Sequence, residues 1–191
     1  MKFVRSFFFD RGRVFLDPGR RPAWFLFGGL ALGLEIFSYV YFQEILGLRP
    51  CELCVYIRFF LLVVFLGALV VAINPGRLFW SAAGGLIIFW ALVRGMVWNL
   101  KLVGIYAQAV EPGYALCSLT APRFPFGLPL DRWLPFLFSP LALCGIDGWR
   151  FLGFNMAEWL LPIFGFLFAG FFGLFIKKFS GLVFILKKLK Y

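Results

Sequence analysis

The sequence predicts an all-α integral membrane protein: a four-helix bundle with both termini cytoplasmic and a long periplasmic loop carrying a short interfacial helix. Two observations lead to this prediction. First, 62% of the 191 residues are apolar and only 15% are charged, against about 45–50% and about 25% in ordinary soluble domains. Second, long apolar stretches recur along the chain. So few polar residues cannot coat a globule, which excludes a soluble domain and a disordered or nucleic-acid-binding tail.

The apolar stretches have the length of membrane-spanning helices. The predicted spans are residues 23–45, 55–73, 78–98 and 157–176. At about 1.5 Å per residue, each is roughly 28–35 Å long as a helix, which is enough to cross a hydrocarbon core of about 30 Å. Helices are expected because lipid offers the backbone no hydrogen-bond partners.

The connections predict how these helices are joined. Asn74-Pro75-Gly76-Arg77 is a strong helix stop, so the second and third helices are expected to be antiparallel neighbours. One outer loop is short, and the other is long. The predicted organisation is a tail (1–22), a transmembrane domain (23–176) with outer loops at 46–54 and 99–156, and a basic tail (177–191).

Charge placement predicts the orientation in the membrane. The formal net charge is +10, and most Lys and Arg residues lie in the two tails and the short turn. By the positive-inside rule these segments face the cytoplasm, and the two other loops face the periplasm of a bacterial inner membrane. The lipid bilayer accounts for the basic balance, so no nucleic-acid partner is expected.

All four cysteines fall in the predicted outer loops. Cys51 and Cys54 form a Cys-x-x-Cys motif at the start of the second helix, while Cys117 and Cys144 lie in the long loop. The bacterial periplasm is oxidising, which suits thiol–disulfide chemistry. Histidine is absent from the chain, which removes Ser-His-Asp and Cys-His catalysis and disfavours most catalytic metal sites.

The close spacing of Cys51 and Cys54 favours a redox role over a structural one. A disulfide between them closes so small a ring that it removes little entropy from the unfolded chain. The pair is therefore better explained as a redox couple or as half of a metal site. Zinc usually needs a second closely spaced pair or histidines, so no metal site is predicted. The alternative is a non-catalytic or metal-binding membrane protein whose outer loops are stapled by disulfides.

Two charged side chains inside the predicted spans are candidate functional groups. Arg58 follows Cys54 by four residues, on the same helical face and one turn deeper. This cation and the helix N-terminus would both stabilise a Cys54 thiolate, within reach of a lipid-soluble electron acceptor. Glu35 lies near the middle of the first span, where a carboxylate could pair with Arg94, take up protons or stay protonated.

The long outer loop contains a short amphipathic pattern. Its apolar residues recur with helical spacing, which predicts a short helix in the membrane interface. Pro135 predicts that this helix is kinked or broken. The alternative is a hydrophobic loop packed on the mouth of the bundle, and either arrangement would keep Cys144 near the membrane. The residues of the pattern are Leu130, Trp133, Leu134 and Leu137.

Several motifs together resemble the DsbB family of disulfide bond formation proteins. The resemblance extends from about Trp24 to Ile176, and the four-helix topology and four cysteines agree with it. Four-helix quinone reductases of the vitamin K epoxide reductase type would place the Cys-x-x-Cys toward the last helix, whereas here it opens the second. The motifs are residues 41–43, 50–58, 94–95, 129–135, 149–153 and 156–159.

The resemblance implies a quinone-dependent thiol–disulfide oxidoreductase that supports disulfide bond formation. It would reoxidise a periplasmic DsbA-like protein of the thioredoxin fold and pass the electrons to membrane quinone, either ubiquinone or menaquinone. Carried over from the family, Cys117 forms the mixed disulfide with the partner, and the released Cys144 attacks Cys51. Cys54 is then freed as the thiolate that faces quinone, and Arg58 matches the family's quinone-site arginine.

Overall fold

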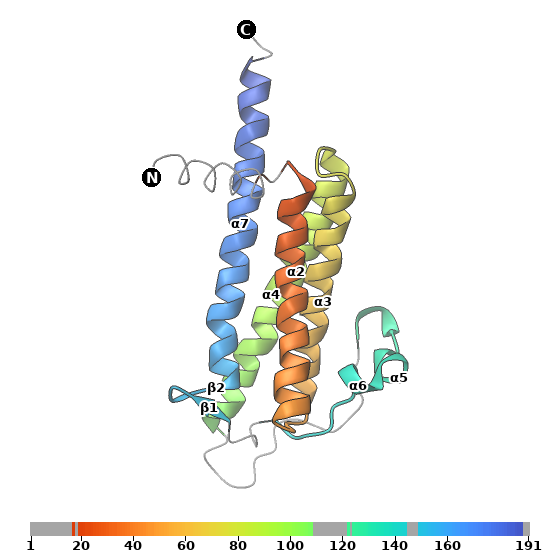
Figure 1. Cartoon of the computed structure of the whole chain (residues 1–191), viewed down its shortest axis with the longest axis vertical. Helices are drawn as coiled ribbons and strands as arrows, with labels where there is room; N and C mark the ends of the chain where they lie inside the picture. The colour runs from red at the N-terminus through yellow and green to blue at the C-terminus, as the bar shows by residue number, and fades with distance from the viewer. Residues whose placement is uncertain (1–16, 18, 109–121, 123, 145–148, 189–191) are drawn as a thin grey trace, which may run out of the picture.

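The computed structural model confirms the all-α four-helix bundle (Figure 1). It describes residues 17, 19–108, 122, 124–144 and 149–188. Four helical stretches in this part of the chain are long and apolar enough to cross a membrane. The long helices are α2 (Arg21–Phe37), continued by the π-helical segment η1 (Ser38–Ile45), and then α3 (Glu52–Ile73), α4 (Leu78–Gln108) and α7 (Met156–Lys188).

All four helical stretches extend beyond the spans expected from the sequence, and α2 begins at Arg21 rather than residue 23. Helix α3 starts at Glu52 rather than residue 55, α4 continues past residue 98, and α7 continues past residue 176. The length of an apolar stretch reflects the thickness of the membrane, whereas a helix continues until a capping or helix-breaking residue ends it. The extra turns carry α4 and α7 beyond the predicted membrane-spanning segments.

Helix α7 begins with two reciprocal hydrogen bonds between side chains and backbone N–H groups. The Asn155 side-chain oxygen accepts from the Glu158 N–H at 2.9 Å, and Glu158 Oε2 accepts from the Asn155 N–H at 2.7 Å. This capping box satisfies two N–H groups at the start of the helix. It joins α7 to an antiparallel hairpin of β1 (Arg150–Phe151) and β2 (Phe154–Asn155).

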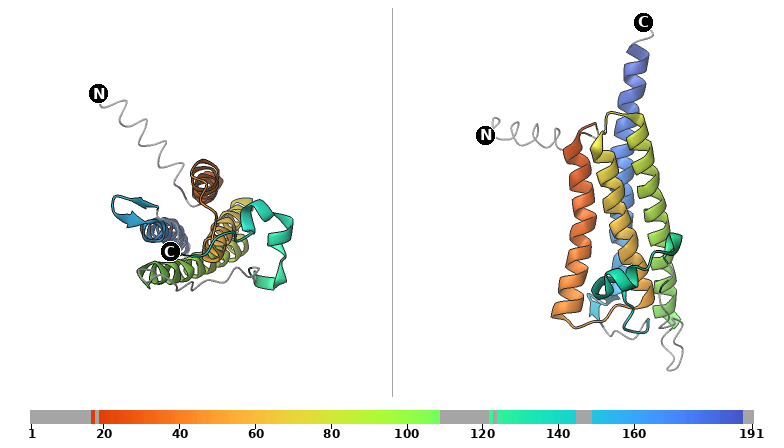
Figure 2. Two further views of the ribbon diagram at one scale, coloured as in Figure 1. Left: turned by 90° about the horizontal axis from the view of Figure 1, so that it is seen from below. Right: turned by 90° about the vertical axis from the view of Figure 1, so that its right-hand side faces the viewer.

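Helix α3 is the centre of the bundle. It packs against α2 on one side and α4 on the other, α4 packs against α7, and α2 meets α7 along only a short stretch (Figure 2). Gly84 on α4 faces Gly67 on α3 so closely that a Cβ at Gly84 would lie 2.6 Å from the Gly67 carbonyl oxygen. The bundle is therefore tightly closed between α3 and α4 and open between α2 and α7.

The start of α2, the α3–α4 turn and α7 are tied together at one end of the bundle. Arg21 Nη2 donates to the Ile73 carbonyl at 3.2 Å. Lys178 Nζ donates to the Pro75 carbonyl at 2.6 Å and to the Ser81 hydroxyl. The Cys-x-x-Cys motif and the hairpin lie at the other end (Figure 1). The predicted separation of the basic turn from this motif is thus present, and which end faces the cytoplasm stays a prediction.

The predicted short helix in the long loop is present and broken at the expected proline. It consists of α5 (Leu130–Trp133) and α6 (Pro135–Phe138), which follow the 3₁₀ turn η2 (Pro125–Gly127). Trp133 is 63% exposed and Phe136 is 55% exposed, whereas Phe138 is buried. The two short helices lie beside the cysteine end of the bundle (Figure 2), so one apolar edge anchors the loop while the other faces outward.

Candidate functional site

The Cys-x-x-Cys motif forms the first turn of α3. Cys51 is the N-cap residue, and its Sγ accepts a hydrogen bond from the Cys54 N–H at 3.3 Å. The sulfur atoms of the two cysteines lie 2.6 Å apart. Both sulfurs therefore lie at the positive end of the helix dipole, within reach of disulfide formation. Cys51 is buried, and Cys54 is half-buried.

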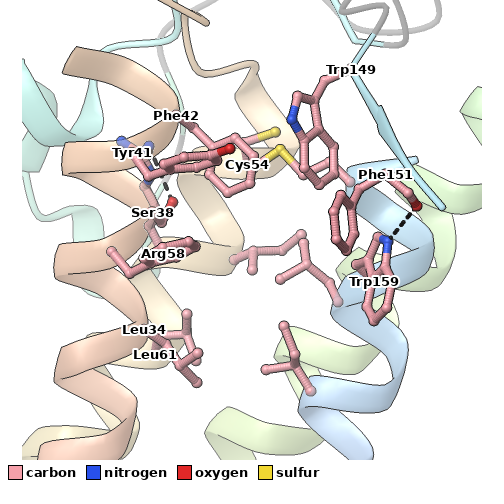
Figure 3. A pocket seen from close by; sticks show the side chains of 15 residues that line it. Leu34, Ser38, Tyr41, Phe42, Cys54, Arg58, Leu61, Trp149, Phe151 and Trp159 are labelled. Carbon is pink, nitrogen blue, oxygen red and sulfur yellow. Dashed lines mark hydrogen bonds between the residues drawn. The ribbon is translucent and has the colours of Figure 1, made fainter. Parts of the chain in front are cut away.

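An apolar cavity of about 300 Å³ lies beside Cys54 (Figure 3). It occupies the open side of the bundle, where α2, η1 and α3 face α7 and the residues leading into the hairpin. Arg58 is the one charged side chain among the described residues that line it. One wall carries Ser38, Tyr41 and Phe42, and the opposite wall carries Trp149, Phe151 and Trp159.

Aromatic contacts hold the hairpin across the outer end of the cavity. Trp159 Nε1 on α7 donates to the Phe151 carbonyl at 3.0 Å. The Phe42 and Trp149 rings meet edge to face with centroids 5.0 Å apart, and Trp149 stacks on Phe151. Phe42, Trp149, Phe151 and Trp159 together therefore form an aromatic wall of the cavity.

Arg58 is almost completely buried, at 4% exposure, and is held by side chains of the first membrane helix. Its Nη1 donates to Gln43 Oε1 at 3.0 Å, and its Nη2 donates to Ser38 Oγ at 3.3 Å. Its Nε lies 3.8 Å from Glu35 Oε1. Buried charges require such partners because transfer out of water is unfavourable.

The pairing of Glu35 with Arg94, one of the three options that the sequence left open, is wrong. Glu35 pairs with Arg58, and Arg94 is exposed on α4. Helix α3 packs on both α2 and α4, so the nearest cation to an α2 carboxylate comes from α3. The positions of Glu35 and Arg94 along the chain do not show which helix supplies the cation that meets Glu35.

The long loop returns to the Cys-x-x-Cys motif through the backbone. The N–H groups of Leu141 and Ala142 donate to the Pro50 carbonyl at 2.9 Å and 3.3 Å, and Ala142 forms a parallel β-bridge with Cys51. Cys144 follows this bridge by two residues and is buried and disulfide-bonded. The structure therefore brings Cys51, Cys54 and the Cys144 segment together. Cys117 lies outside the described residues.

A comparison with known proteins matches the part of the chain that contains these residues. The family "Disulfide bond formation protein DsbB" matches residues 20–175. The chain belongs to the DsbB family. This match includes the Cys-x-x-Cys motif, the cavity and the segment of Cys144, and it confirms the resemblance seen in the sequence motifs.

Curated relatives of this DsbB-family protein match most of its length. It is 38% identical over 146 residues to Disulfide bond formation protein B of Mannheimia succiniciproducens, covering 76% of this chain and 80% of that one. It is 40% identical over 148 residues to the protein of the same name from Aeromonas salmonicida, covering 75% and 81%. It is 40% identical over 134 residues to Protein-disulfide oxidoreductase DsbI of Lelliottia amnigena, covering 67% and 60%.

Family membership and the four apolar helices make this DsbB-family protein a membrane oxidoreductase of disulfide bond formation. This class is favoured over the non-catalytic protein with stapled loops. Within the part of the chain that the structure describes, no three His, Cys, Asp or Glu side chains gather as metal ligands.

Sequence reasoning missed the residues that surround Arg58. Gln43 belongs to a motif that had been noted, but its contact with Arg58 had not been predicted. Trp149 also belongs to one of these motifs, but its place on the cavity was not predicted, and Ser38 carried no signal beyond its side-chain type. A hydroxyl or amide inside an apolar span is the signal that could have singled out Ser38 and Gln43, because such groups need partners in a membrane.

Proposed function

We propose that this DsbB-family protein oxidises the dithiol of a DsbA-like, thioredoxin-fold protein in the periplasm and transfers the electrons to membrane quinone. One observation carries the proposal: Cys54 and Arg58 line a single apolar cavity, and the Cys51 sulfur lies 2.6 Å from that of Cys54. A cysteine pair with one member on such a cavity can exchange electrons with a lipid-soluble acceptor.

The cavity residues fit a quinone. A quinone ring is flat and apolar and has carbonyl oxygens that accept hydrogen bonds. Tyr41, Phe42 and Trp149 offer aromatic surface, and the Arg58 guanidinium offers donors. When bound, a quinone supplies an acceptor for two electrons and two protons. Arg58 would hold a carbonyl oxygen, and Cys54 would present its sulfur from the first turn of α3.

Thiol–disulfide exchange would bring the electrons to Cys54. One partner thiolate attacks Cys117, breaks a Cys117–Cys144 disulfide and releases Cys144. The Cys144 thiolate attacks Cys51, breaks the Cys51–Cys54 disulfide and leaves Cys54 as a thiolate. The second partner thiolate completes the partner's disulfide and releases Cys117, which re-forms its bond with Cys144 and frees Cys51. The net change is one disulfide made in the partner and one reduced between Cys51 and Cys54.

The placement of the Cys144 segment supports the second exchange. The β-bridge between Ala142 and Cys51 holds the backbone of the long loop beside the redox pair. Exchange requires an attacking thiolate to reach the sulfur of a disulfide. Because this backbone contact lies two residues before Cys144, only a short stretch of chain has to move.

The redox potentials favour the proposed direction. A DsbA-type protein is a strong oxidant, at about −120 mV, so its reoxidation requires an acceptor of higher potential. About 30 mV corresponds to 1.4 kcal/mol for a two-electron couple, so a modestly higher potential makes the transfer downhill. We therefore propose ubiquinone or menaquinone as the acceptor, with the cysteine end of the bundle in the periplasm of a bacterial inner membrane.

Quinone reduction by the purified protein in detergent tests the proposal. A reduced DsbA-like protein is the electron donor, and either ubiquinone or menaquinone is the acceptor, followed by ultraviolet absorbance. We expect turnover by the wild type and none by Cys54→Ser. Arg58→Lys should raise the quinone KM, because lysine keeps the charge but loses the planar set of donors. Arg77→Lys, a matched change in the distant α3–α4 turn, should leave the quinone KM and kcat unchanged.

The outcomes separate the proposal from its alternatives. Quinone reduction that survives in Cys54→Ser would remove Cys54 from the step. A folded, oxidised wild type that reduces neither quinone would overturn the proposal and return attention to stapled outer loops or metal binding. Equal effects of Arg58→Lys and Arg77→Lys would show that the cavity is not the site of electron transfer.

A further inference from the structure

The three guanidinium nitrogens of Arg58 each face a different side chain of one helix. Nε faces Glu35, Nη1 donates to Gln43, and Nη2 donates to Ser38. Arginine has several rotatable bonds, and holding it in one orientation opposes considerable side-chain entropy. Three contacts from a single helix therefore fix the direction in which the guanidinium points.

The π-helical form of η1 makes this arrangement possible. Gln43 follows Ser38 by five positions, and both lie within η1. On an α-helix, five residues turn the side-chain direction by about 140° from the start, so the two could not face one arginine. A π-helix takes more residues per turn and bonds from i to i+5, which returns the fifth residue to the same face.

Gln43 also ties this arrangement to the long loop. Its Nε2 donates to the Phe136 carbonyl of α6 at 3.0 Å, while its Oε1 accepts from Arg58. Because the two ends of one amide are engaged, its orientation is set from both sides. The side chain that holds Arg58 is thus itself held by the loop that leads to Cys144.

Glu35 contacts Arg58 without lining the cavity itself. It is 3% exposed, and it is not among the described residues that line the cavity. Neither of its carboxylate oxygens has a hydrogen-bond partner in the described part of the chain, so the ion pair with Arg58 is the interaction that accounts for its charge there. A carboxylate buried in this way favours one position of the cation.

We infer that Glu35, Ser38 and Gln43 are positioning residues that hold the Arg58 guanidinium against the cavity, and that the π-helical segment η1 brings Ser38 and Gln43 onto it together. The inference rests on the proposed function only for the role of the cavity in quinone binding. The placement of Arg58 is a property of the protein itself and is measurable without quinone.

Substitutions that keep the shape of the side chain test the inference. The replacement side chains in Ser38→Thr and Ser38→Val have the same shape, but only threonine keeps the hydroxyl that accepts from Arg58. Gln43→Met removes both amide contacts at similar length. Glu44→Gln is the matched control, because Glu44 lies in the same segment and is exposed. Glu35→Gln removes the charge and keeps the shape.

Solvent exchange of the Arg58 Nε–H, followed by heteronuclear NMR of the full-length protein in detergent without quinone, is the direct readout. The signal is assigned by its loss in Arg58→Lys. We expect exchange about tenfold or more faster in Ser38→Val, Gln43→Met and Glu35→Gln, because each loses a contact to a charged group. Ser38→Thr and Glu44→Gln should exchange as the wild type does.

The quinone KM is the second readout. It should rise about tenfold in Ser38→Val and in Gln43→Met. In Ser38→Val, which keeps the contact between Gln43 and the long loop, the rate of thiol exchange with the reduced partner should stay unchanged. Equal exchange of the Arg58 Nε–H in Ser38→Val and Ser38→Thr, or wild-type exchange in Gln43→Met, would overturn the inference. If Arg58 is held as expected but the wild type reduces no quinone, the positioning inference stands and the proposed function fails.

Discussion

Ala142 forms a parallel β-bridge with Cys51, although the two residues belong to different connections between the long helices. The bridge is supported by the hydrogen bonds from Leu141 and Ala142 to the Pro50 carbonyl. It places the backbone that leads to Cys144 beside the first cysteine of the Cys-x-x-Cys motif. The two cysteine-bearing loops therefore meet through main-chain contacts that do not depend on a bond between sulfurs.

Removing this contact should slow thiol–disulfide exchange between the cysteines of the two loops. Ala142→Pro eliminates the N–H that donates to Pro50 at 3.3 Å. A neutral hydrogen bond contributes about 0.5–1.5 kcal/mol, so exchange between the loop cysteines and Cys51 should slow about two- to tenfold. Rapid acid quench with thiol trapping measures the rate, and Ala142→Ser, which keeps the N–H, should behave as the wild type. An unchanged rate in Ala142→Pro would mean that the bridge does not guide the loop.

Deleting Val40 should be tolerated. Val40 is an exposed residue of η1. Glu35 and Gln43 are eight residues apart, and without Val40 they would be seven apart, which an α-helix places only about 20° out of phase. The segment can then adopt an α-helix and keep Glu35 and Gln43 on Arg58. We expect at least half of the wild-type quinone reduction.

Deleting Leu32 is the matched control for this prediction. It lies in the α-helical part of α2, between the buried residues Ala31 and Glu35. The deletion would turn one of these about 100° relative to the other, and no π-helical turn lies between them to absorb the change. Activity should be lost. An equal loss of quinone reduction in both deletion variants would mean that the extra residue of η1 is itself required for activity.

The close approach of α3 and α4 should not accept a larger residue. A Cβ at Gly84 would lie 2.5 Å from Val71 Cγ2 and 2.6 Å from the Gly67 carbonyl oxygen. Overpacking of this kind destabilises by about 1–3 kcal/mol, so Gly84→Ala should lower the free energy of unfolding by that amount. Gly173→Ala, where a Cβ would meet nothing within 4 Å, is the control. Unfolding of the two variants in detergent by denaturant measures the difference.

The capping box of α7 should contribute measurably to the hairpin end of the bundle. Asn155→Ala removes the oxygen that accepts from the Glu158 N–H at 2.9 Å. Loss of an N-cap side chain costs about 0.5–2 kcal/mol. Amide hydrogen exchange in the first turn of α7 should therefore become faster, while exchange in the central turns of α3 stays unchanged. Glu44→Ala, at an exposed carboxylate elsewhere, should leave both regions as they are.

Much of the site followed from local spacing. Cys54 and Arg58 were expected on one helical face because residues four apart lie one turn from each other, and both line the same cavity. The break at Pro135 followed from the lack of an N–H and the fixed φ of proline, and the chain divides there into α5 and α6. Such features depend on neighbours in sequence, so the sequence is sufficient to predict them.

The sequence by itself determined the bundle, because bilayer thickness and the need to satisfy every backbone group leave only long apolar helices. Tertiary structure decided that α3 also packs against α2, and hence that Glu35 pairs with Arg58 rather than Arg94. It also decided the π-helical turn that brings Ser38 and Gln43 together, and the return of the loop to Cys51. The contacts made by Arg58 and by Cys51 join residues far apart in sequence, and periodicity carries no information about the partner across a helix interface.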